Sequence, residues 1–327
     1  MHKGDGSAVH VIGWRCVRAV LGRAVALGAV ALLGVWWLGA DYALAQAVMV
    51  CTYAIAGLGV VIIVGQSGQI SLGQGALLAL GAYAQTILVV AGVSPLLAMT
   101  CAIALGAAGG WCASLPARRL GGLYFAMSTL AFALIVEEGI ARGESLTRGA
   151  AGLLVPAFTV GGWQADSAAA QLLVSAVALA LAFVCCALWV NSARGREWRA
   201  VREDEIAAAA CGVDVARAKA SAFVVGGGLS GLAGALYAHW IGFISPEQFG
   251  LMLSFELLML AFIGGARHLS GALWGALVIV AIPQFNAVLR DVLPTELARA
   301  AGLEAILFGA VIVAVILFRP QGIAGGR

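Results

Sequence analysis

Apolar residues dominate this chain in long runs, which are separated by short clusters of charged, glycine and proline residues. The runs lack the strict alternation of a half-buried strand, and most approach the roughly 20 residues that a helix needs to cross a bilayer. The pattern therefore predicts an all-α, polytopic membrane helix bundle. We place about ten transmembrane helices near residues 20–39, 43–64, 71–91, 95–115, 123–140, 169–190, 218–241, 252–265, 271–289 and 304–318.

These helices form one predicted transmembrane domain, residues 20–318, which follows an N-terminal segment of residues 1–19 and precedes a C-terminal tail of residues 319–327. Two connections are long: an outer loop over residues 141–168 and an inner loop over residues 191–217. The first apolar run admits a second interpretation, because basic residues before it and small residues after it also mark a cleavable secretory signal. The mass of the mature N-terminus decides between the two interpretations.

The composition indicates that lipid is the solvent of this chain. Hydrophobic residues make up 62% of the 327 residues, charged residues make up 11%, and the mean hydropathy is +0.99. An average soluble domain has about 25% charged residues, so this chain lacks the polar side chains to cover its own surface. Each large apolar side chain left in water would cost about 1.5–3 kcal/mol relative to burial.

The positions of positive charge predict the orientation. When both termini are cytoplasmic, fifteen of the 19 lysine and arginine residues fall on the inner side, and Arg142, Arg148, Arg290 and Arg299 fall outside. Basic residues near the ends of membrane helices are concentrated in the cytoplasm. The distribution therefore predicts that both termini are cytoplasmic, because the reverse orientation would invert it.

The inner loop is predicted to contain a short helix along the membrane surface. Acidic residues begin this helix, where they suit the positive end of its dipole, four alanines favour it, and Gly212 ends it in a left-handed cap. Asp214 can cap the transmembrane helix that follows. A compact, capped helix between two spans suits insertion into a cleft of a cytoplasmic motor, and the alternative is a solvated connector.

The segment Gly65–Gly75 joins the second and third spans with four glycines and five polar side chains. Its amides and hydroxyls can satisfy an interrupted helix at membrane depth, provided that the backbone is buried or lines a cavity. Two interpretations follow. The segment lines a translocation path, or it forms a tight cytoplasmic turn that precedes a closely packed helix.

Two further features depart from plain lipid-facing helix. Gly227, Gly231 and Ala235 repeat every four residues on one face of the seventh span, which predicts helix packing in preference to a hinge. Glu256 lies within the short eighth span, where an ionised carboxylate must face protein, water or a partner. We favour a structural acceptor at this position, and a proton relay is the alternative.

Signatures of other chemistries are missing from the sequence. The four histidines and seven cysteines form no cluster with ligand spacing, so we expect no metal, and no basic patch points to nucleic acid. The sequence has no phosphate-binding loop, no Gly-x-Ser-x-Gly elbow and no His-Glu-x-x-His pair. We therefore expect a protein that is not an enzyme and has no cofactor of its own.

Several stretches resemble a known family. They are Gly68–Ala76 with Gly81–Tyr83, Gly122–Phe132, Gly195–Ala222, Gly231–Ala238, Ile244–Glu247, Glu256–Leu258 and Arg319–Ile323. In these stretches the sequence is similar to the LivM-type permeases of high-affinity branched-chain amino-acid ABC importers, whose relatives include urea permeases. The likeness extends over most of the chain.

The resemblance implies a multi-pass permease subunit of the inner membrane. Its expected partners are a second, LivH-like permease, two cytoplasmic ATPases that bind the ATP, a periplasmic substrate-binding protein and the lipid bilayer. By resemblance the inner-loop helix is the coupling element seated on an ATPase, with coupling residues Arg202, Glu203, Asp204, Glu205, Ala208 and Gly212. The candidate residues of the translocation path are Gln66, Gln69, Ser71, Gln74, Tyr83, Tyr124, Ser128, Thr129 and Glu256.

The resemblance favours import of branched-chain or other small amino acids, with alternating access driven by the partner ATPases. Other transport classes remain open at this point. A permease for urea, amides or another small solute, and a sugar permease of related fold, would share the ATP-driven mechanism. An ion-coupled secondary transporter that uses Glu256 would need no ATPase.

Overall fold

The computed structural model describes residues 40–118, 120–292 and 321–325, together with residues 309, 313 and 317. The chain divides into two compact units, Met1–Ala47 and Val48–Arg327. The first predicted span, residues 20–39, and most of the last, residues 304–318, lie outside the described residues. The second unit contains the features described below.

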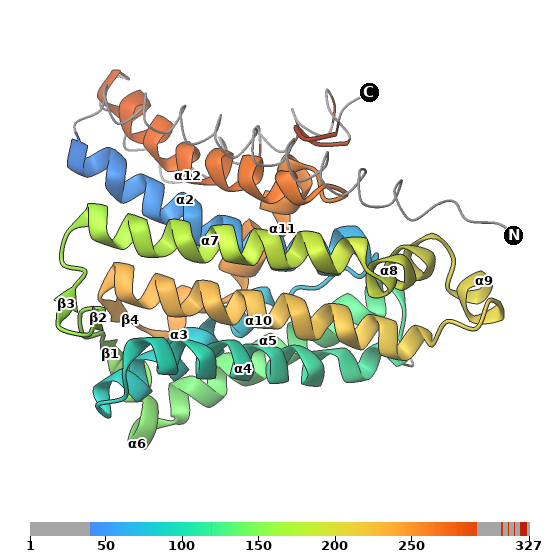
Figure 1. Cartoon of the computed structure of the whole chain (residues 1–327), viewed down its shortest axis with the longest axis horizontal. Coiled ribbons are helices and arrows are strands. Elements are labelled where there is room, and N and C mark those ends of the chain that lie inside the picture. The colour runs from blue at the N-terminus through green and yellow to red at the C-terminus, as the bar shows by residue number, and fades with distance from the viewer. Residues whose placement is uncertain are drawn as a thin grey trace, which may run out of the picture. The chain divides into compact units, whose positions relative to one another are not determined.

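Long helices build this unit, as the apolar runs predict (Figure 1). They are α2 (Ala40–Val60, which begins in the first unit), α3 (Gln74–Val90), α4 (Pro95–Ser114), α5 (Gly122–Arg142), α7 (Ala168–Asn191), α10 (Val215–Ile241), α11 (Leu251–Gly264) and α12 (Leu269–Val292). Each coincides to within a few residues with one predicted span. Shorter helical turns are η2 (Leu115–Arg118), α6 (Glu144–Thr147), η3 (Gly149–Ala151) and η4 (Pro246–Phe249).

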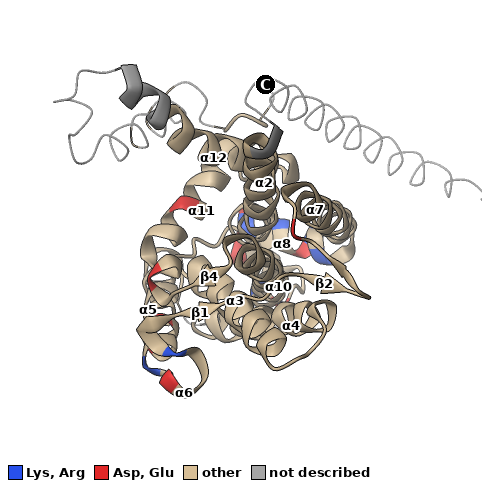
Figure 2. Ribbon diagram, turned by 90° about the vertical axis from the view of Figure 1, so that its left-hand side faces the viewer, with Lys and Arg blue, Asp and Glu red and all other residues tan. Residues whose placement is uncertain are grey.

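Six helical segments in the described part of the chain are long and apolar enough to cross a bilayer, and two shorter apolar helices accompany them. Figure 2 shows a bundle that is predominantly tan, with blue and red ribbon at α6 and at α8 (Ala193–Glu203). The helical, multi-pass character is confirmed. A total of ten spans and the cytoplasmic position of both termini stay predictions.

Helix α10 packs against α4 through glycines instead of large side chains. A methyl group added to Gly227 would overlap the carbonyl oxygen of Gly106, and one added to Gly231 would overlap that of Ala102. Ala235, one turn further along α10, is fully buried. The two backbones therefore touch, and van der Waals contacts between them hold the helices together in the absence of a hydrophobic driving force.

Short strands organise residues 141–168, the predicted outer loop. Strand β1 (Leu153–Leu154) pairs antiparallel with β4 (Phe243–Ile244), directly after α10. Strands β2 (Thr159–Val160) and β3 (Trp163–Gln164) form a hairpin, and its two-residue turn, Gly161–Gly162, has positive φ at both positions, as a type I′ turn requires. The all-α prediction is incomplete here: the β1–β4 pair joins segments distant in sequence, whereas the β2–β3 hairpin is local and its Gly161–Gly162 turn was a signal in the sequence.

The predicted inner loop forms two helices: the expected short helix with an acidic first turn and an alanine run is α9 (Glu205–Ala210), and the separate helix before it, α8, was not predicted. Helix α8 ends at Asp204, whose backbone is extended, and α9 begins directly after it. The carboxylate of Asp204 accepts hydrogen bonds from the backbone N–H groups of Ile206 and Ala207, so it starts a new helix. Both helices lie at the opposite end of α7 and α10 from the strands (Figure 1).

The predicted caps of the inner loop are confirmed. Gly212 has a φ of 86°, in the left-handed region, and the Asp214 carboxylate accepts a hydrogen bond from the backbone N–H of Arg217 in the first turn of α10. These caps end α9 and begin α10 within a few residues. The α8–α9 pair is thus a compact body with defined ends.

We expect Gly227→Ala to destabilise the bundle and Gly228→Ala to leave it unchanged or more stable. Both replacements improve helix propensity by about 1 kcal/mol. At Gly227 the methyl group has no space and costs about 1–3 kcal/mol or more through displaced backbone. At Gly228 the nearest atom it would meet, on Ile103, is 3.5 Å away. Thermal unfolding of both variants in detergent measures the difference, and equal melting temperatures would contradict the packing described for α10.

Candidate functional site

The second predicted span does not pass directly into the third. Helix α2 continues as a π-helical turn, η1 (Val61–Gln66). The chain after η1 is not helical until α3 begins at Gln74. All five polar side chains of Gly65–Gly75 are buried. The backbone groups of such a break lack the bonds of a continuous helix and need partners elsewhere. Residues 65–75 are called the interrupted segment below.

Hydroxyl groups from two other helices bind this backbone. The N–H of Leu72 donates to Oγ1 of Thr129 in α5 at 3.0 Å, and the N–H of Gly75 donates to Oγ of Ser254 in α11 at 2.9 Å. A Cβ atom at Gly75 would lie 2.6 Å from the carbonyl oxygen of Phe249, so a side chain has no space there. Buried hydrogen bonds therefore tie the interrupted segment to α5 and α11.

Three of the predicted path residues carry buried polar atoms without a protein partner. The amide oxygen of Gln74 accepts a hydrogen bond from Ser230 of α10 at 2.9 Å, but its amide nitrogen has no partner among the described residues. The same is true of Oε1 of Gln69 and of the hydroxyl of Tyr83. Buried polar atoms normally bind protein or water, and the hydrogen bonds within the described residues do not account for these three atoms.

Helices α8 and α9 are fixed to α10 by side chains that point inward. Trp198 donates through Nε1 to Oγ of Ser221 at 2.8 Å. Glu205 forms an ion pair of 2.7 Å with Lys219, whose side chain is only 4% exposed. Ile206 is 83% exposed. A fixed, capped body that presents one large apolar side chain is suited to binding a partner protein.

Arg202, at the end of α8, also points inward. Its Nη1 donates to the backbone carbonyl oxygen of Gly65 at 2.6 Å, and its Nη2 donates to Oε1 of Glu203 at 2.6 Å. This hydrogen bond and the charge of Arg202 hold the pKa of Glu203 below its ordinary value. Glu203 is therefore ionised at neutral pH. Its contribution to stability is complete above the ordinary pKa and is lost only as the pH falls through the lowered one.

The remaining predicted residues lie in different environments. On α5, Tyr124 is 73% exposed and Thr129 is buried, while the Ser128 hydroxyl donates to the carbonyl oxygen of Phe125 within its own helix. On α9, Ala208 is buried beneath the exposed face. The structure thus buries Gln66, Gln69, Ser71 and Gln74 within the interrupted segment, places Thr129 against it, and leaves Tyr124 on the outside of α5.

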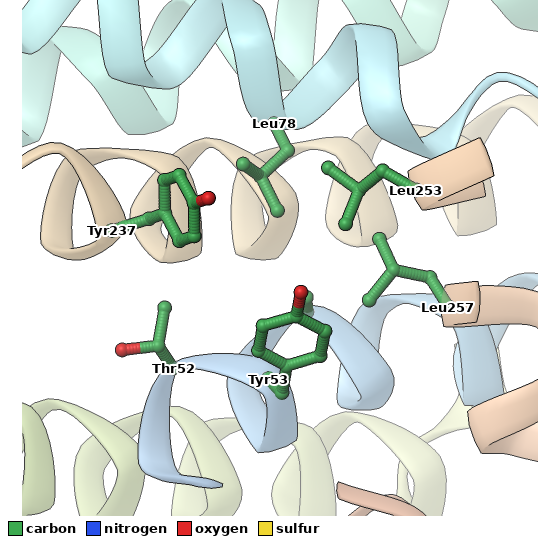
Figure 3. A pocket seen from close by; sticks show the side chains of 7 residues that line it. Thr52, Tyr53, Leu78, Tyr237, Leu253 and Leu257 are labelled. Atoms are coloured by element: carbon green, nitrogen blue, oxygen red, sulfur yellow. The ribbon is translucent and has the colours of Figure 1, made fainter. Parts of the chain in front are cut away.

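A narrow gap lies between α2, α3, α10 and α11 (Figure 3). Tyr53 and Tyr237 border it together with leucines of α3 and α11. Its empty volume is about 210 Å³, but the gap is too narrow at every point to hold a water molecule. Oε2 of Glu256 lies 3.5 Å from the Tyr53 hydroxyl, at the limit of hydrogen bonding. This contact joins α11 to α2, as a structural acceptor would, whereas a proton relay through the gap would need water.

Comparison with known proteins identifies the architecture. The family described as "Branched-chain amino acid transport system / permease component" matches residues 42–316. The chain belongs to this permease family. It is 29% identical over 302 residues to the high-affinity branched-chain amino acid transport system permease protein LivM of Salmonella typhimurium, and 28% identical over 302 residues to LivM of Escherichia coli. Both alignments cover 85% of the permease and 68% of the relative.

The permease is also similar to LivH of Escherichia coli, with 25% identity over 296 residues that cover 84% of the permease and 91% of LivH. No solved structure matches the chain. The resemblance to LivM-type permeases is confirmed, and the protein is a transport permease, not an enzyme. The roles of the individual site residues stay predictions.

Sequence reasoning missed several residues that shape this site. Ser230 and Ser254 bind the interrupted segment, Lys219 holds α9, and Ile206 is the exposed apolar side chain of that helix. A single polar residue within an apolar run is a usable signal. That signal marks Ser230, the single polar side chain between Ala222 and Leu236, but it cannot say which distant group the hydroxyl binds.

Thr129→Val should destabilise the permease more than Ser128→Ala. Valine keeps the shape of Thr129 but leaves the buried N–H of Leu72 without an acceptor, which costs about 1–3 kcal/mol. Ser128 binds only its own helix, so its removal should cost less than about 1 kcal/mol. Thermal unfolding in detergent measures both. A Thr129→Val protein as stable as the Ser128→Ala protein would mean that the hydroxyl does not support the interrupted segment.

Glu205→Ala should destabilise the α8–α9 pair, because it leaves the buried Lys219 ammonium without its partner. Loss of one partner of a fully buried pair costs about 3–5 kcal/mol, and about 2 kcal/mol is expected here because Glu205 is half exposed. The double variant Glu205→Ala/Lys219→Met should recover most of the loss. Limited proteolysis of residues 191–217 reports the effect. A double variant that is cleaved as fast as Glu205→Ala would contradict this role of the pair.

Proposed function

We propose that this protein is the membrane-spanning permease subunit of an ATP-driven importer for branched-chain amino acids in the inner membrane. It works with a second, LivH-like permease, two cytoplasmic ATPases that bind and hydrolyse ATP, and a periplasmic substrate-binding protein. The family match over residues 42–316 and the similarity to both LivM and LivH proteins support this assembly.

The observation that carries the proposal is the construction of the α8–α9 pair. Trp198, Arg202 and Glu205 tie it inward, while Ile206 is directed away from the protein. A partner that binds Ile206 would move the α8–α9 pair as one body. The hydrogen bonds and the ion pair would then transmit this motion to α10 and to η1. A merely solvated connector would need none of these ties. Closure of the ATPases on ATP then rocks the helices between outward and inward openings.

The solute passes along the surface of this subunit, and the second permease completes the path. Close glycine contacts fill the space around α10, and the gap beside Tyr53 holds no water. Near the outer end of α5, by contrast, an open groove has a volume of about 650 Å³. It combines apolar side chains with carboxylates and is lined by Leu134, Ile135, Glu137, Glu138, Ala141, Ala150, Pro246 and Glu247. Such walls suit the side chain and the ammonium group of an apolar amino acid.

The proposal is tested by reconstituting the permease with its LivH-like subunit, both ATPases and the binding protein in liposomes. We expect uptake of labelled leucine that requires ATP and the binding protein and that persists after a protonophore collapses the proton gradient. Excess unlabelled leucine, but not urea or ribose, should compete. Uptake driven by a proton gradient without ATP would instead identify an ion-coupled carrier, and competition by urea or ribose alone would reassign the substrate.

Ile206→Asp should weaken attachment of the ATPases without unfolding the permease, because an exposed side chain loses no internal contact when it is replaced. A central apolar contact of an interface is worth 2 kcal/mol or more, so retention on copurification should fall more than about tenfold. Leu146→Asp, at an exposed leucine of the outer loop, is the matched control and should retain the ATPases. Equal retention by the two variants would remove α9 from the ATPase interface.

Glu203→Lys gives a second measure of the same contact. It replaces the carboxylate beside Arg202 with a positive charge, whereas Glu203→Gln removes the charge and keeps the size. Both variants should insert into the membrane. If the ATPases bind the Glu203 carboxylate, the lysine variant should lose ATPase retention more strongly than the glutamine variant. Normal retention in both would count against the predicted coupling role of Glu203.

A further inference from the structure

One arginine makes two contacts with the interrupted segment. The Arg202 guanidinium donates to the carbonyl oxygen of Gly65, and its aliphatic part lies over Gly68. Gly68 has a φ of 73°, and a Cβ atom there would lie 2.7 Å from Cγ of Arg202. The absence of a side chain at Gly68 therefore makes the space that the Arg202 stem occupies. The Arg202 side chain is 19% exposed, so most of it is enclosed by the protein.

The carbonyl group that Arg202 binds belongs to a crowded junction. Gly65 is the fifth residue of the π-helical turn η1, whose last carbonyl groups lack partners within a helix. A methyl group at Gly65 would overlap the carbonyl oxygen of Ala266. The next residue, Gln66, donates through Nε2 to the carbonyl oxygen of Arg267 at 3.0 Å. The turn therefore cannot shift without moving the connection between α11 and α12.

From this junction the interrupted segment reaches the membrane helices. Its N–H groups bind Thr129 of α5 and Ser254 of α11, and its Gln74 side chain binds Ser230 of α10. A displacement applied at the carbonyl of Gly65 is thus distributed to three helices through buried hydrogen bonds. Packed elements of this kind have discrete arrangements instead of deforming continuously.

The other inward ties of α8 and α9 end on different elements. Trp198 and Glu205 bind residues of α10, and Arg199 donates through Nη1 to the carbonyl oxygen of Val190 in α7 at 2.9 Å. Among the described residues, Arg202 is the side chain of α8 or α9 that hydrogen-bonds to the interrupted segment. Arg199 is therefore a matched comparison: it lies one turn away on the same helix and also donates to a backbone carbonyl.

We infer that Arg202 is a positioning residue that transmits displacement of the α8–α9 pair to the interrupted segment through its hydrogen bond to Gly65. The inference rests on the proposed function, because it takes an ATPase as the source of the displacement. It assigns to Arg202 a role inside the permease in place of direct contact with the ATPase. Uptake therefore depends on the guanidinium even when the ATPases are fully bound.

The test compares Arg202→Met, Arg202→Lys and Arg199→Met in the complete importer. Methionine keeps the aliphatic stem over Gly68 and removes every donor, whereas lysine keeps one donor for the carbonyl of Gly65. For each variant, ATPase retention, ATP hydrolysis stimulated by the binding protein, and leucine uptake are measured on equal amounts of assembled complex. The informative quantity is leucine imported per ATP hydrolysed.

We expect Arg202→Met to retain the ATPases and to lower uptake per ATP about tenfold, within the roughly 5- to 150-fold range of couplings between sites. Arg202→Lys should recover at least part of the loss, and Arg199→Met should stay within about twofold of the unmodified importer. A purely structural role would lower the amount of assembled complex and leave uptake per ATP unchanged. That result, or equal losses in Arg202→Met and Arg199→Met, would overturn the inference.

A measurement on the unmodified importer keeps the inference testable if Arg202→Met does not fold. Hydrogen exchange of the backbone N–H groups of residues 67–72 is compared between the nucleotide-free and the ATP-trapped complex. We expect their exchange to change together with that of α8 and α9, and a change in α8 and α9 alone would overturn the inference. Failure of the proposed function is distinguishable, because the unmodified importer would then show no ATP-driven uptake at all.

Discussion

Hydrocarbon around the helices imposes the constraint on which the rest of this structure depends: backbone N–H and C=O groups that water cannot reach must find partners inside the protein. Continuous helices meet this constraint by themselves, but the break between η1 and α3 does not. Its backbone N–H groups donate to the hydroxyls of Thr129 and Ser254, and the carbonyl oxygen of Gly65 accepts a hydrogen bond from the Arg202 guanidinium. The interrupted segment therefore joins α5, α8 and α11 through hydrogen bonds.

Close backbone packing holds the helices around the interrupted segment in fixed positions. Apolar side chains gain little by leaving lipid for another apolar surface, so the helices associate where small residues let their backbones touch. Gly227 and Gly231 of α10 meet Gly106 and Ala102 of α4 in this way. In the described part of the chain, α10 also has direct backbone contact with α3, at Gly81 and Leu78, and the proposed path therefore runs on the surface of the subunit.

The end of the permease that carries α8 and α9 combines these two properties. Asp204 caps α9, and Trp198 and Glu205 fasten the α8–α9 pair to α10. Ile206 is available to a partner, while Arg202 reaches back to the interrupted segment. One exposed face and one face tied to the membrane helices suit the proposed role of this pair as the contact between the permease and its partner ATPases.

Hydropathy, charge and caps by themselves determined the membrane class, the approximate helix ends, the Gly212 and Asp214 caps and the glycine face of α10, because these depend on lipid partitioning and on neighbours within a few residues. Short sequence motifs also indicated the family. Only the tertiary structure decided the partners of the interrupted segment, since its hydrogen bonds to Thr129, Arg202 and Ser254 span 57, 137 and 179 residues. No local pattern encodes such pairings, because they form only when separate helices pack together.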